Sequence, residues 1–190
     1  SDFLVRSWIK TYGLPAIITN CSNNYGPFQF PEKLIPLMIA NCLDERNLPV
    51  YGRGENIRDW IFVEDHCSAI ENIIENGKSG DRYNIGGDCE IKNLDMVYNI
   101  CSVLDKLKPR KNKKLYSDLI EFVEDRPGHD FRYAVDSSKI RSQLGWNPKK
   151  SFEDGLESTI RWYIDNESWW RNIQKNKYDQ ERLGLKKIKG

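Results

Sequence analysis

Two adjacent amides, Asn23 and Asn24, follow a β-branched run at 16–19 and precede a Tyr-Gly-Pro turn at 25–27. Each amide offers hydrogen-bond donors and an acceptor without net charge, which suits hydroxyls, carboxamides and phosphate oxygens. A polar loop between a strand and a helix is also where open α/β sheets bind ligands, at the carboxyl end of a strand. An ordinary turn explains the same residues, because Asn, Gly and Pro are common in turns. Taken alone, the stretch leaves both interpretations open.

The densest charged cluster surrounds Arg58, which lies between a glycine turn at 52–54 and an aromatic strand. A guanidinium in that position suits two-point binding of a phosphate. The alternative is a salt bridge with the neighbouring Asp59. The two glycines do not form a dinucleotide fingerprint, because no third glycine and no tight strand-to-helix turn follow them. We expect them to form a hairpin-like turn instead.

A second guanidinium and an imidazole, Arg126 and His129, lie on the rigid turn Arg-Pro-Gly-His. With Arg58 and Lys33 they supply cations that would bind a diphosphate if the fold brought them together. The alternative is a set of separate surface charges, and the sequence alone does not decide between them.

Metal and hydrolase chemistry find no support in the sequence. Neither His66 nor His129 has a second ligand at a metal-binding spacing, so we expect no metal site. There is no Gly-x-Ser-x-Gly motif either. Among the aromatic residues, Tyr51 is the one that we expect to lie against a flat ring.

The composition is that of a soluble globular chain: 190 residues, 39% hydrophobic, 30% charged and a net charge of +1. This balance gives no indication of nucleic-acid binding. We expect no membrane span and no signal peptide, because no apolar run approaches the required length. The five cysteines are scattered without a C-x-x-C pair, which favours reduced thiols and a cytoplasmic location.

Apolar periodicity and turn residues predict alternating strands and helices over the first half, hence an α/β fold. We expect helices at 2–12, 32–46, 65–76, 94–104, 136–144 and 151–164, and strands at 16–19, 49–51, 57–63, 82–85, 119–123 and 133–135. The expected N-terminal caps are Asp65, Asn93, Asp136 and Ser151. Residues 171–190 are rich in Lys and Arg, and we expect a frayed basic tail there.

Five stretches, taken in order, resemble the dTDP-glucose 4,6-dehydratase family of extended short-chain dehydrogenases/reductases. They lie at 19–27, 30–36, 57–66, 83–87 and 125–129. The Asn-Cys-Ser-Asn-Asn-Tyr-Gly-Pro loop and the Asp-Arg-Pro-Gly-His turn are the most specific, and the resemblance runs from Ser1 to about Trp170. It implies the C-terminal portion of an NAD(P)-binding Rossmann-type fold with a smaller α/β substrate-binding lobe. It also implies NAD-dependent conversion of dTDP-glucose to dTDP-4-keto-6-deoxyglucose and water.

The resemblance further assigns one cofactor contact, Asn24 to NAD, and a set of contacts to a dTDP-sugar. Those substrate contacts are Asn23 for the sugar nucleotide; Lys33 and Leu34 along the nucleotide's path; Pro49, Val50 and Tyr51 beside the thymine; Arg58 and Asn93 on phosphate oxygens; and Asp125, Arg126, Pro127, Gly128 and His129 over the diphosphate and ribose.

The family's glycine-rich turn, Asp-Glu pair and Tyr-x-x-x-Lys dyad correspond to positions upstream of Ser1. We therefore expect no catalytic residue in this chain, NAD held mainly by the upstream half, and an inactive isolated chain. The resemblance implies a remnant of the NAD-binding domain at 1–30 and 57–87, and a sugar-nucleotide lobe at 31–56 and 88–170. The family is commonly a homodimer. The apolar face of the opening helix (Val5, Trp8, Ile9 and Tyr12) would serve such an interface or pack within the chain.

Two other functions stay open at this point. One is another NAD-dependent nucleotide-sugar epimerase, decarboxylase or dehydratase of the same superfamily, although Tyr51 and the turn at 126–129 argue against it. The other is a non-catalytic fragment that binds a nucleotide-sugar, or binds nothing because part of its sheet is absent.

Overall fold

The computed structural model describes residues 1–177 and forms two compact units, each of which is described by itself. Unit 1 comprises residues 1–26, 57–91 and 132–155. Unit 2 comprises residues 27–56, 92–131 and 156–177 of the described chain. Both units combine helices with parallel strand pairs, which confirms the predicted α/β class.

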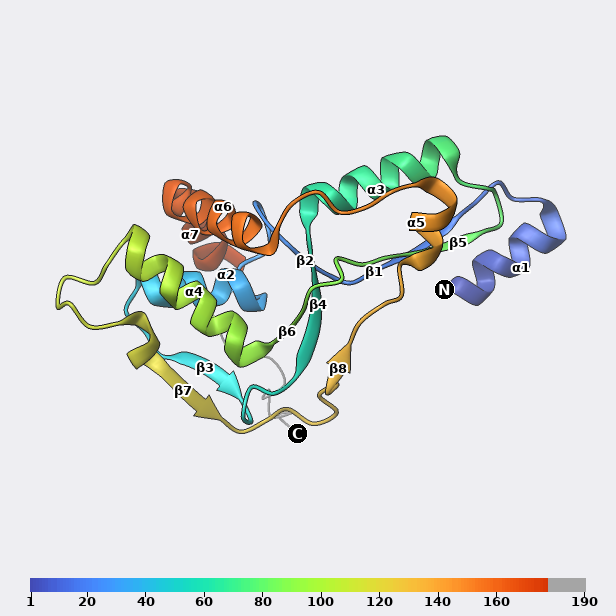
Figure 1. Ribbon diagram of the computed structural model, residues 1–190. Helices are drawn as coiled ribbons and strands as arrows, with labels where there is room; N and C mark the ends of the chain where they lie inside the picture. The colour runs from blue at the N-terminus through green and yellow to red at the C-terminus, as the bar shows by residue number, and fades with distance from the viewer. Residues whose placement is uncertain (178–190) are drawn as a thin grey trace. The chain divides into compact units, whose positions relative to one another are not determined.

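Unit 1 contains most of the strands (Figure 1). Its elements are α1 (Asp2–Tyr12), β1 (Ile18–Cys21), β2 (Asn23–Tyr25), β4 (Ile57–Phe62), α3 (Val63–Asn76), β5 (Arg82–Ile85), β6 (Glu90–Lys92, at the boundary), β8 (Arg132–Tyr133), α5 (Ser138–Leu144) and the start of α6 (Phe152–Asp165).

A single residue, Ser22, separates β1 from β2, and the two strands pair with different partners. β1 runs parallel to β5, whereas β2 runs parallel to β4 with Asn24 opposite Ile61. β4 also pairs with β6 and β8. The prediction of a polar loop at Asn23 and Asn24 is therefore wrong in its secondary structure, because the ladder to β4 holds both residues in a short strand.

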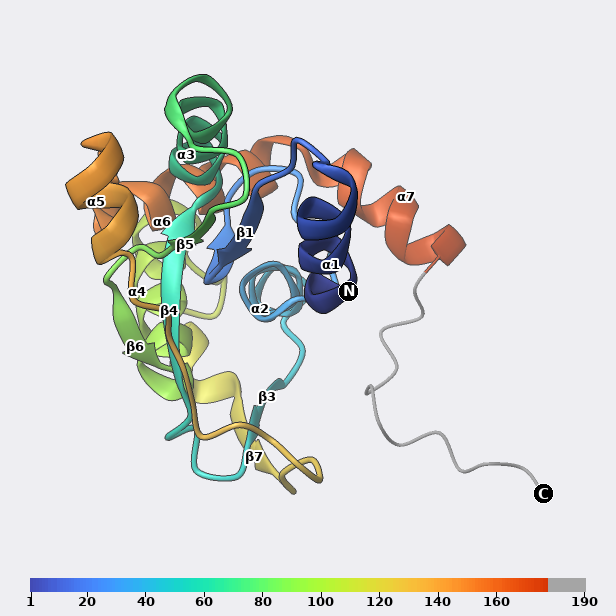
Figure 2. The ribbon, with the colours of Figure 1, turned by 90° about the vertical axis from the view of Figure 1, so that its right-hand side faces the viewer.

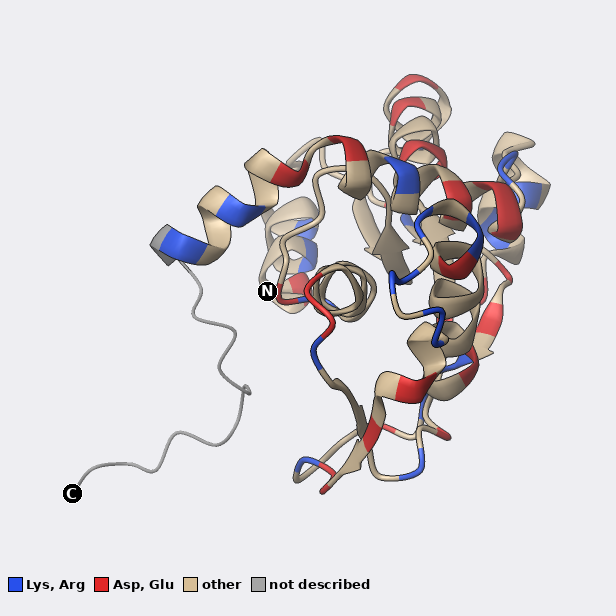
Figure 3. Ribbon diagram, turned by 90° about the vertical axis from the view of Figure 1, so that its left-hand side faces the viewer, with Lys and Arg blue, Asp and Glu red and all other residues tan. Residues whose placement is uncertain are grey.

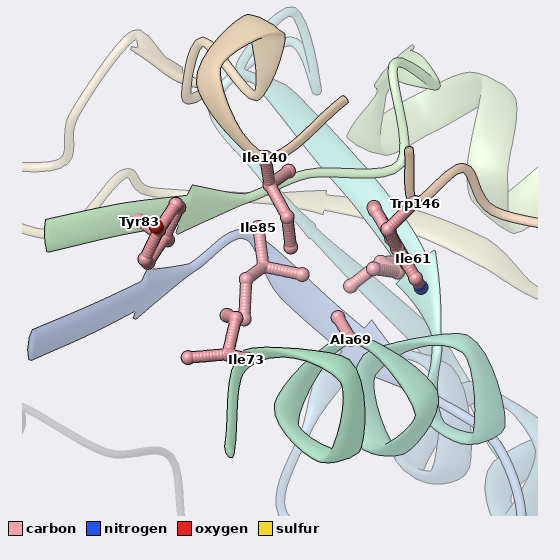
Figure 4. Packing of buried hydrophobic residues seen from close by; sticks show 7 residues of the cluster. All are labelled: Ile61, Ala69, Ile73, Tyr83, Ile85, Ile140 and Trp146. Carbon is pink, nitrogen blue, oxygen red and sulfur yellow. The ribbon is translucent and has the colours of Figure 1, made fainter. Parts of the chain in front are cut away.

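The core of unit 1 fills the space between α3, the strands and α5 (Figure 4). It consists of Ile61, Ala69, Ile73, Tyr83, Ile85, Ile140 and Trp146. Ala69 and Ile73 are four residues apart, so they lie on the same face of α3. The Trp146 indole N–H donates to Ser68 Oγ at 3.0 Å, which satisfies the polar end of a buried ring.

Unit 2 is built from helices around one pair of parallel strands, β3 and β7, which lie side by side in Figures 1 and 2. Its elements are α2 (Leu34–Leu43), β3 (Leu48–Tyr51), α4 (Asn93–Leu107), the 3-10 helix η1 (Tyr116–Leu119), β7 (Ile120–Val123), the rest of α6 and α7 (Glu167–Lys177). α2 packs against α4 through fully buried side chains, among them Ile39 and Ile100.

The predicted frayed tail is wrong for residues 171–177, which belong to α7. Trp170 is fully buried and its indole N–H donates to the Tyr163 carbonyl at 2.9 Å. The Arg171 guanidinium lies 2.7 Å from an Asp44 carboxylate oxygen, which joins α7 to the end of α2. Within α7 the basic residues follow the acidic first turn at Glu167, as the red and blue bands of this helix show in Figure 3. Residues 178–190 lie outside the described part.

Three of the predicted helix caps, Asp65, Asn93 and Asp136, do not lie at the N-cap position. α3 begins at Val63, and the Asp65 carboxylate instead accepts the backbone N–H groups of Lys149 and Lys150, both at 3.0 Å. Asn93 is the first residue of α4 rather than its cap. Ser151 is confirmed, because its Oγ accepts the Asp154 N–H at 3.1 Å.

The Asp136 side chain accepts the Ser138 N–H at 2.8 Å, one residue before the N-cap position, Ser137. The turn predicted at 52–54 is confirmed, but it does not join a hairpin, since β3 pairs with β7 and β4 pairs with β2.

Segment 132–155 belongs to unit 1, whereas the predicted division placed it with the sugar-nucleotide lobe. This segment belongs to unit 1 because β8 pairs in parallel with β4 and α5 packs on β5. Which unit serves the cofactor and which the substrate stays a prediction.

Gly87 lies between β5 and β6, where the chain passes close to the backbone of β4. A Cβ at this position would lie 1.9 Å from the Trp60 carbonyl oxygen, so alanine forces the backbone to move. We expect Gly87→Ala to lower the free energy of unfolding by about 3 kcal/mol or more, the upper range for overpacking. Denaturant unfolding followed by circular dichroism measures this change.

Gly145→Ala is the matched control. Gly145 has a left-handed φ of 64° and no atom within 4 Å of an added Cβ, so only conformational strain of about 1–2 kcal/mol applies. Equal losses in the two variants would contradict the close backbone approach at Gly87.

Candidate functional site

Residues 51–56, here called the Tyr51 turn, begin at the last residue of β3 and belong to unit 2. The turn closes with the Gly54 N–H donating to the Tyr51 carbonyl at 2.9 Å. Gly52 and Gly54 have φ values of 56° and 70°, a region that side chains disfavour. A Cβ on Gly54 would lie 2.7 Å from both Val50 and Leu94. The glycines therefore allow the turn to approach the start of α4.

The end of β7 lies on one side of the Tyr51 turn. The Gly52 N–H donates to the Val123 carbonyl at 2.8 Å, and a Cβ on Gly52 would meet the Asp125 side chain at 3.2 Å. Asp125 is therefore adjacent to the turn although it is more than 70 residues away in sequence.

Asp125 organises the charged turn that follows it. Its Oδ1 accepts the Arg126 backbone N–H at 2.8 Å and lies 2.7 Å from His129 Nδ1. The bond from His129 lowers the pKa of the Asp125 carboxyl. The rings of Tyr51 and His129 meet edge to face, with centroids 6.0 Å apart. The predicted thymine and diphosphate contacts are therefore neighbours in unit 2.

The start of α4 lies on the other side of the Tyr51 turn. The Asn93 N–H donates to the Asn56 carbonyl at 2.9 Å, and the Leu94 N–H donates to the Gly54 carbonyl at 3.0 Å. Asn93 Oδ1 is buried and has no hydrogen-bond partner within residues 1–177. Asn56, which sequence reasoning missed, also donates through Nδ2 to the Asp130 carbonyl at 3.2 Å. We call Tyr51, Asn93, Asp125, Arg126 and His129 the Tyr51 cluster.

Six other predicted substrate contacts in unit 2 lie outside the Tyr51 cluster. Val50 is buried and its side chain packs against Gly54. Lys33 ion-pairs with its neighbour Glu32, Nζ to Oε1 at 2.9 Å, and the structure shows no bond from it to the Tyr51 cluster. Leu34, half-buried, begins α2, and Pro49 lies in β3 opposite Glu121. Pro127 and Gly128 are exposed.

In unit 1, Arg58 is buried and its Nη1 donates to the Ile57 carbonyl at 2.7 Å. Consecutive strand residues point to opposite faces, so Asp59 is directed away from Arg58. The Asp59 carboxylate accepts the Cys89 N–H at 2.8 Å, and burial raises its pKa. Arg58 belongs to unit 1 whereas Lys33 and Arg126 belong to unit 2, so their convergence on one diphosphate stays a prediction.

Asn24 also lies in unit 1, and its partner is a residue that sequence reasoning considered only as a metal ligand. His66 Nδ1 lies 2.8 Å from Asn24 Oδ1, and Asn24 Nδ2 donates to the Ser22 carbonyl at 3.2 Å. Burial lowers the pKa of His66. Its position in the sequence could have marked His66 as a site residue, because it lies one helical turn after a strand, at the carboxyl end of the sheet.

Unit 1 also contains a cavity of about 210 Å³ with aromatic walls, among them Tyr25, Trp60 and Phe62. Lys150 and Cys89 contribute polar atoms to its lining, and burial raises the pKa of the Cys89 thiol to about 11. None of the predicted site residues lines this cavity.

Membrane-spanning helices and metal-ligating clusters are both absent from the described part of the chain. No helix there is long and apolar enough to cross a membrane. No group of three metal-ligating side chains gathers there, and all five cysteines are free thiols. The absence of a metal site stays a prediction.

Comparisons with known proteins give a family model and similar relatives that are both described as 4,6-dehydratases of nucleotide-linked sugars. Residues 1–159 match the family model described as GDP-mannose 4,6 dehydratase. A dTDP-glucose 4,6-dehydratase of Neisseria meningitidis is 57% identical over 189 residues, which are 98% of this chain and 53% of that protein. The chain thus spans about half the length of the curated relatives it matches.

Two solved structures extend the comparison. A dTDP-glucose 4,6-dehydratase of Bacillus anthracis in complex with NAD is 46% identical, with a TM-score of 0.81 over 90% of this chain and 52% of that one. One from Streptomyces venezuelae with NAD and TYD bound is 43% identical, with a TM-score of 0.82 over 91% and 51%. The resemblance and the extended short-chain dehydrogenase fold predicted from the sequence are confirmed.

The lowered pKa of His66 predicts a pH dependence of stability. Between its folded value and the unfolded value of about 6.5, the unfolded chain binds more protons than the folded chain. The free energy of unfolding therefore falls as the pH drops through about 6.5 towards the folded pKa, and it is recovered above that window. Denaturant unfolding at a series of pH values from about 5 to 7.5 measures the slope.

His66→Asn supplies the comparison, because it removes this titration and leaves every other group, including His129, in place. The variant should show a shallower slope than the wild type over the same pH range. Identical slopes in the two proteins would mean that His66 is not buried as a neutral ring.

Proposed function

The chain belongs to the GDP-mannose 4,6-dehydratase family, and we propose that it supplies the sugar-nucleotide contacts of a dTDP-glucose 4,6-dehydratase. That reaction converts dTDP-glucose to dTDP-4-keto-6-deoxyglucose and water. The observation that carries the proposal is the Tyr51 cluster, in which three segments far apart in sequence meet at one turn of unit 2. Relatives that cover nearly all of this chain at 50–57% identity have the same activity in their names.

The Tyr51 cluster offers each chemical part of a nucleoside diphosphate a partner. The Tyr51 ring is held edge-on by His129 and would lie against the thymine, with Pro49 beside it. The Arg126 guanidinium is exposed and would bind diphosphate oxygens, which favour charge-assisted bonds. Asp125 stabilises the turn at 125–129 through two hydrogen bonds.

Asn93 completes the proposed site through its carboxamide. Its buried Oδ1 has no partner within the described residues, and such an acceptor is costly unless a donor reaches it. The two ends of the amide then act differently: Oδ1 would accept from a ligand hydroxyl, and Nδ2 would donate to a phosphate oxygen.

The residues of this chain also fit a contact with NAD. Asn24 lies just beyond the carboxyl end of β1, and its carboxamide is held in place by His66 and Ser22. A fixed neutral amide suits the hydroxyl and carboxamide groups of a dinucleotide. When bound, NAD accepts a hydride from the sugar and later returns it.

Proton transfer in this reaction needs an acid and a base beside the sugar. The sequence contains no Tyr-x-x-x-Lys pattern, and none of the residues in the Tyr51 cluster replaces a tyrosinate–lysine pair. We therefore infer that this chain binds and orients the substrate but does not turn it over by itself.

The runner-up is a UDP-sugar epimerase or decarboxylase of the same superfamily. The dTDP-sugar and UDP-sugar enzymes differ in the base that would lie against Tyr51. Thymine has a methyl group that uracil lacks. An apolar contact at that position favours dTDP.

We also propose a homodimer in a reducing, cytoplasmic setting. On α1, Trp8 and Tyr12 are 51% and 72% exposed and contact each other edge to face, whereas Val5 and Ile9 are half-buried. A second copy would cover the exposed rings. The free cysteines fit a reducing compartment.

Calorimetry with dTDP tests the proposed site directly. We expect the chain to bind dTDP more tightly than UDP. Tyr51→Ala should weaken dTDP binding by about tenfold or more, because stacking of a base on an aromatic ring contributes about 1–3 kcal/mol. Tyr98→Ala, on an exposed position of α4, is the matched control and should leave affinity unchanged. Failure to bind dTDP, or equal effects of the two variants, would contradict the assignment.

A second experiment addresses turnover. The purified chain with dTDP-glucose and NAD should form no 4-keto-6-deoxy sugar above the uncatalysed background, measured by the alkali-induced absorbance of the keto product or by mass spectrometry. Product formed in proportion to chain concentration would show that catalytic groups exist here which the sequence did not reveal.

A further inference from the structure

The His66 imidazole connects the first turn of α3 to strand β2 within unit 1. Its Nδ1 lies 2.8 Å from Asn24 Oδ1, across 42 positions of sequence. α3 and β2 pack against each other, and His66 is half-buried between them. The contact joins the helix to the place where the chain leaves β5 and begins to pair with β4.

The orientation of the Asn24 carboxamide follows from its other contacts. One end of the amide lies 3.2 Å from the Ser22 carbonyl oxygen and 3.4 Å from Cys21 Sγ. A carbonyl oxygen only accepts hydrogen bonds, so the amide nitrogen must face it. The amide oxygen therefore faces His66.

This orientation determines which nitrogen of His66 carries the hydrogen. An amide oxygen only accepts, so His66 Nδ1 must be the donor. The imidazole is then in its Nδ1–H form, and Nε2 carries no hydrogen while the ring is neutral. Rotation of the Asn24 amide by 180° would set two oxygens against each other at Ser22 and two donors against each other at His66.

We propose that His66 is a positioning residue, whose Nδ1–H fixes the Asn24 carboxamide in the orientation that it presents to the cofactor. The inference rests on the proposed function, in which Asn24 contacts NAD. His66 itself does not touch the cofactor in this account. It acts through the amide, which is held in a single orientation before any ligand arrives.

The tautomer can be measured on the wild-type chain. Long-range ¹H–¹⁵N correlation spectra near pH 7.5 distinguish a protonated Nδ1 from a protonated Nε2. The proposal expects the Nδ1–H tautomer as the main species. An Nε2–H tautomer would overturn it, because the bond to Asn24 Oδ1 would then have no hydrogen.

Three variants separate positioning from packing. In His66→Asn the side-chain amide places a donor near the position of Nδ1, whereas in His66→Gln it lies near that of Nε2. We expect His66→Asn to bind NAD within about twofold of the wild type. His66→Gln and His66→Ala should bind about three- to tenfold more weakly in calorimetry, the effect of one hydrogen bond. Equal affinity in all four proteins, or no rescue by Asn, would overturn the proposal.

The side-chain NH₂ resonances of Asn24 provide a readout that does not depend on cofactor. They should be sharp and slowly exchanging in the wild type and in His66→Asn, and broadened or rapidly exchanging in His66→Ala and His66→Gln. If the wild-type chain binds no NAD by itself, as when the upstream half supplies most of the cofactor contacts, these resonances still decide whether His66 fixes the amide. Sharp Asn24 resonances in all variants would overturn the role of His66.

Discussion

The structure of the proposed site depends on the close approach of the Tyr51 turn to the start of α4. Gly54 allows this approach, because a side chain there would collide with Val50 and Leu94 at 2.7 Å. With the turn in place, two of its carbonyl groups accept the first N–H groups of α4, and its Gly52 N–H donates to β7. Three segments that start near 51, 93 and 125 are thereby fixed to one another. Every contact proposed for the nucleotide in unit 2 other than Lys33 and Leu34 is attached to one of them.

A second fixed point lies in unit 1, where the chain changes partner strands at Ser22. Backbone pairing holds Asn23 and Asn24 in β2, and the His66 imidazole holds the orientation of the Asn24 amide. The two units use the same principle: a polar side chain proposed to contact a ligand is first positioned by the protein. Asp125 holds His129 in unit 2 as His66 holds Asn24 in unit 1. Such preorganisation lowers the entropy cost of binding.

The class of fold could be predicted from the sequence, because the hydrophobic periodicity and the bounding turn residues were clear for most helices and strands. The run Ile57–Phe62 is β-branched and aromatic, and Ala69 and Ile73 are spaced as one face of a helix. Prediction from the sequence failed where a tertiary contact determines the local structure. Asp65 looks like a helix cap, but two backbone N–H groups at 149 and 150 need its carboxylate. A basic composition at 171–177 suggested a tail, yet the buried Trp170 and the ion pair of Arg171 anchor a helix.

The residues of the candidate site came from a family resemblance, and their roles remain predictions. The structure adds their surroundings. Tyr51, Asn93, Asp125 and His129 lie in or beside the Tyr51 turn, whereas Lys33 forms an ion pair with Glu32 instead. Asn56 was missed and His66 was considered only as a metal ligand, because their hydrogen-bond partners lie 74 and 42 positions away. Periodicity does not reveal such distant pairs.

The most direct test is to titrate the ¹⁵N-labelled chain with dTDP and follow the backbone amides. The account predicts the largest shifts at Gly52, Leu94, Arg126 and His129, together with contacts between the thymine methyl group and the Tyr51 ring. Shifts confined to the lining of the aromatic cavity in unit 1, with the Tyr51 cluster unchanged, would contradict it.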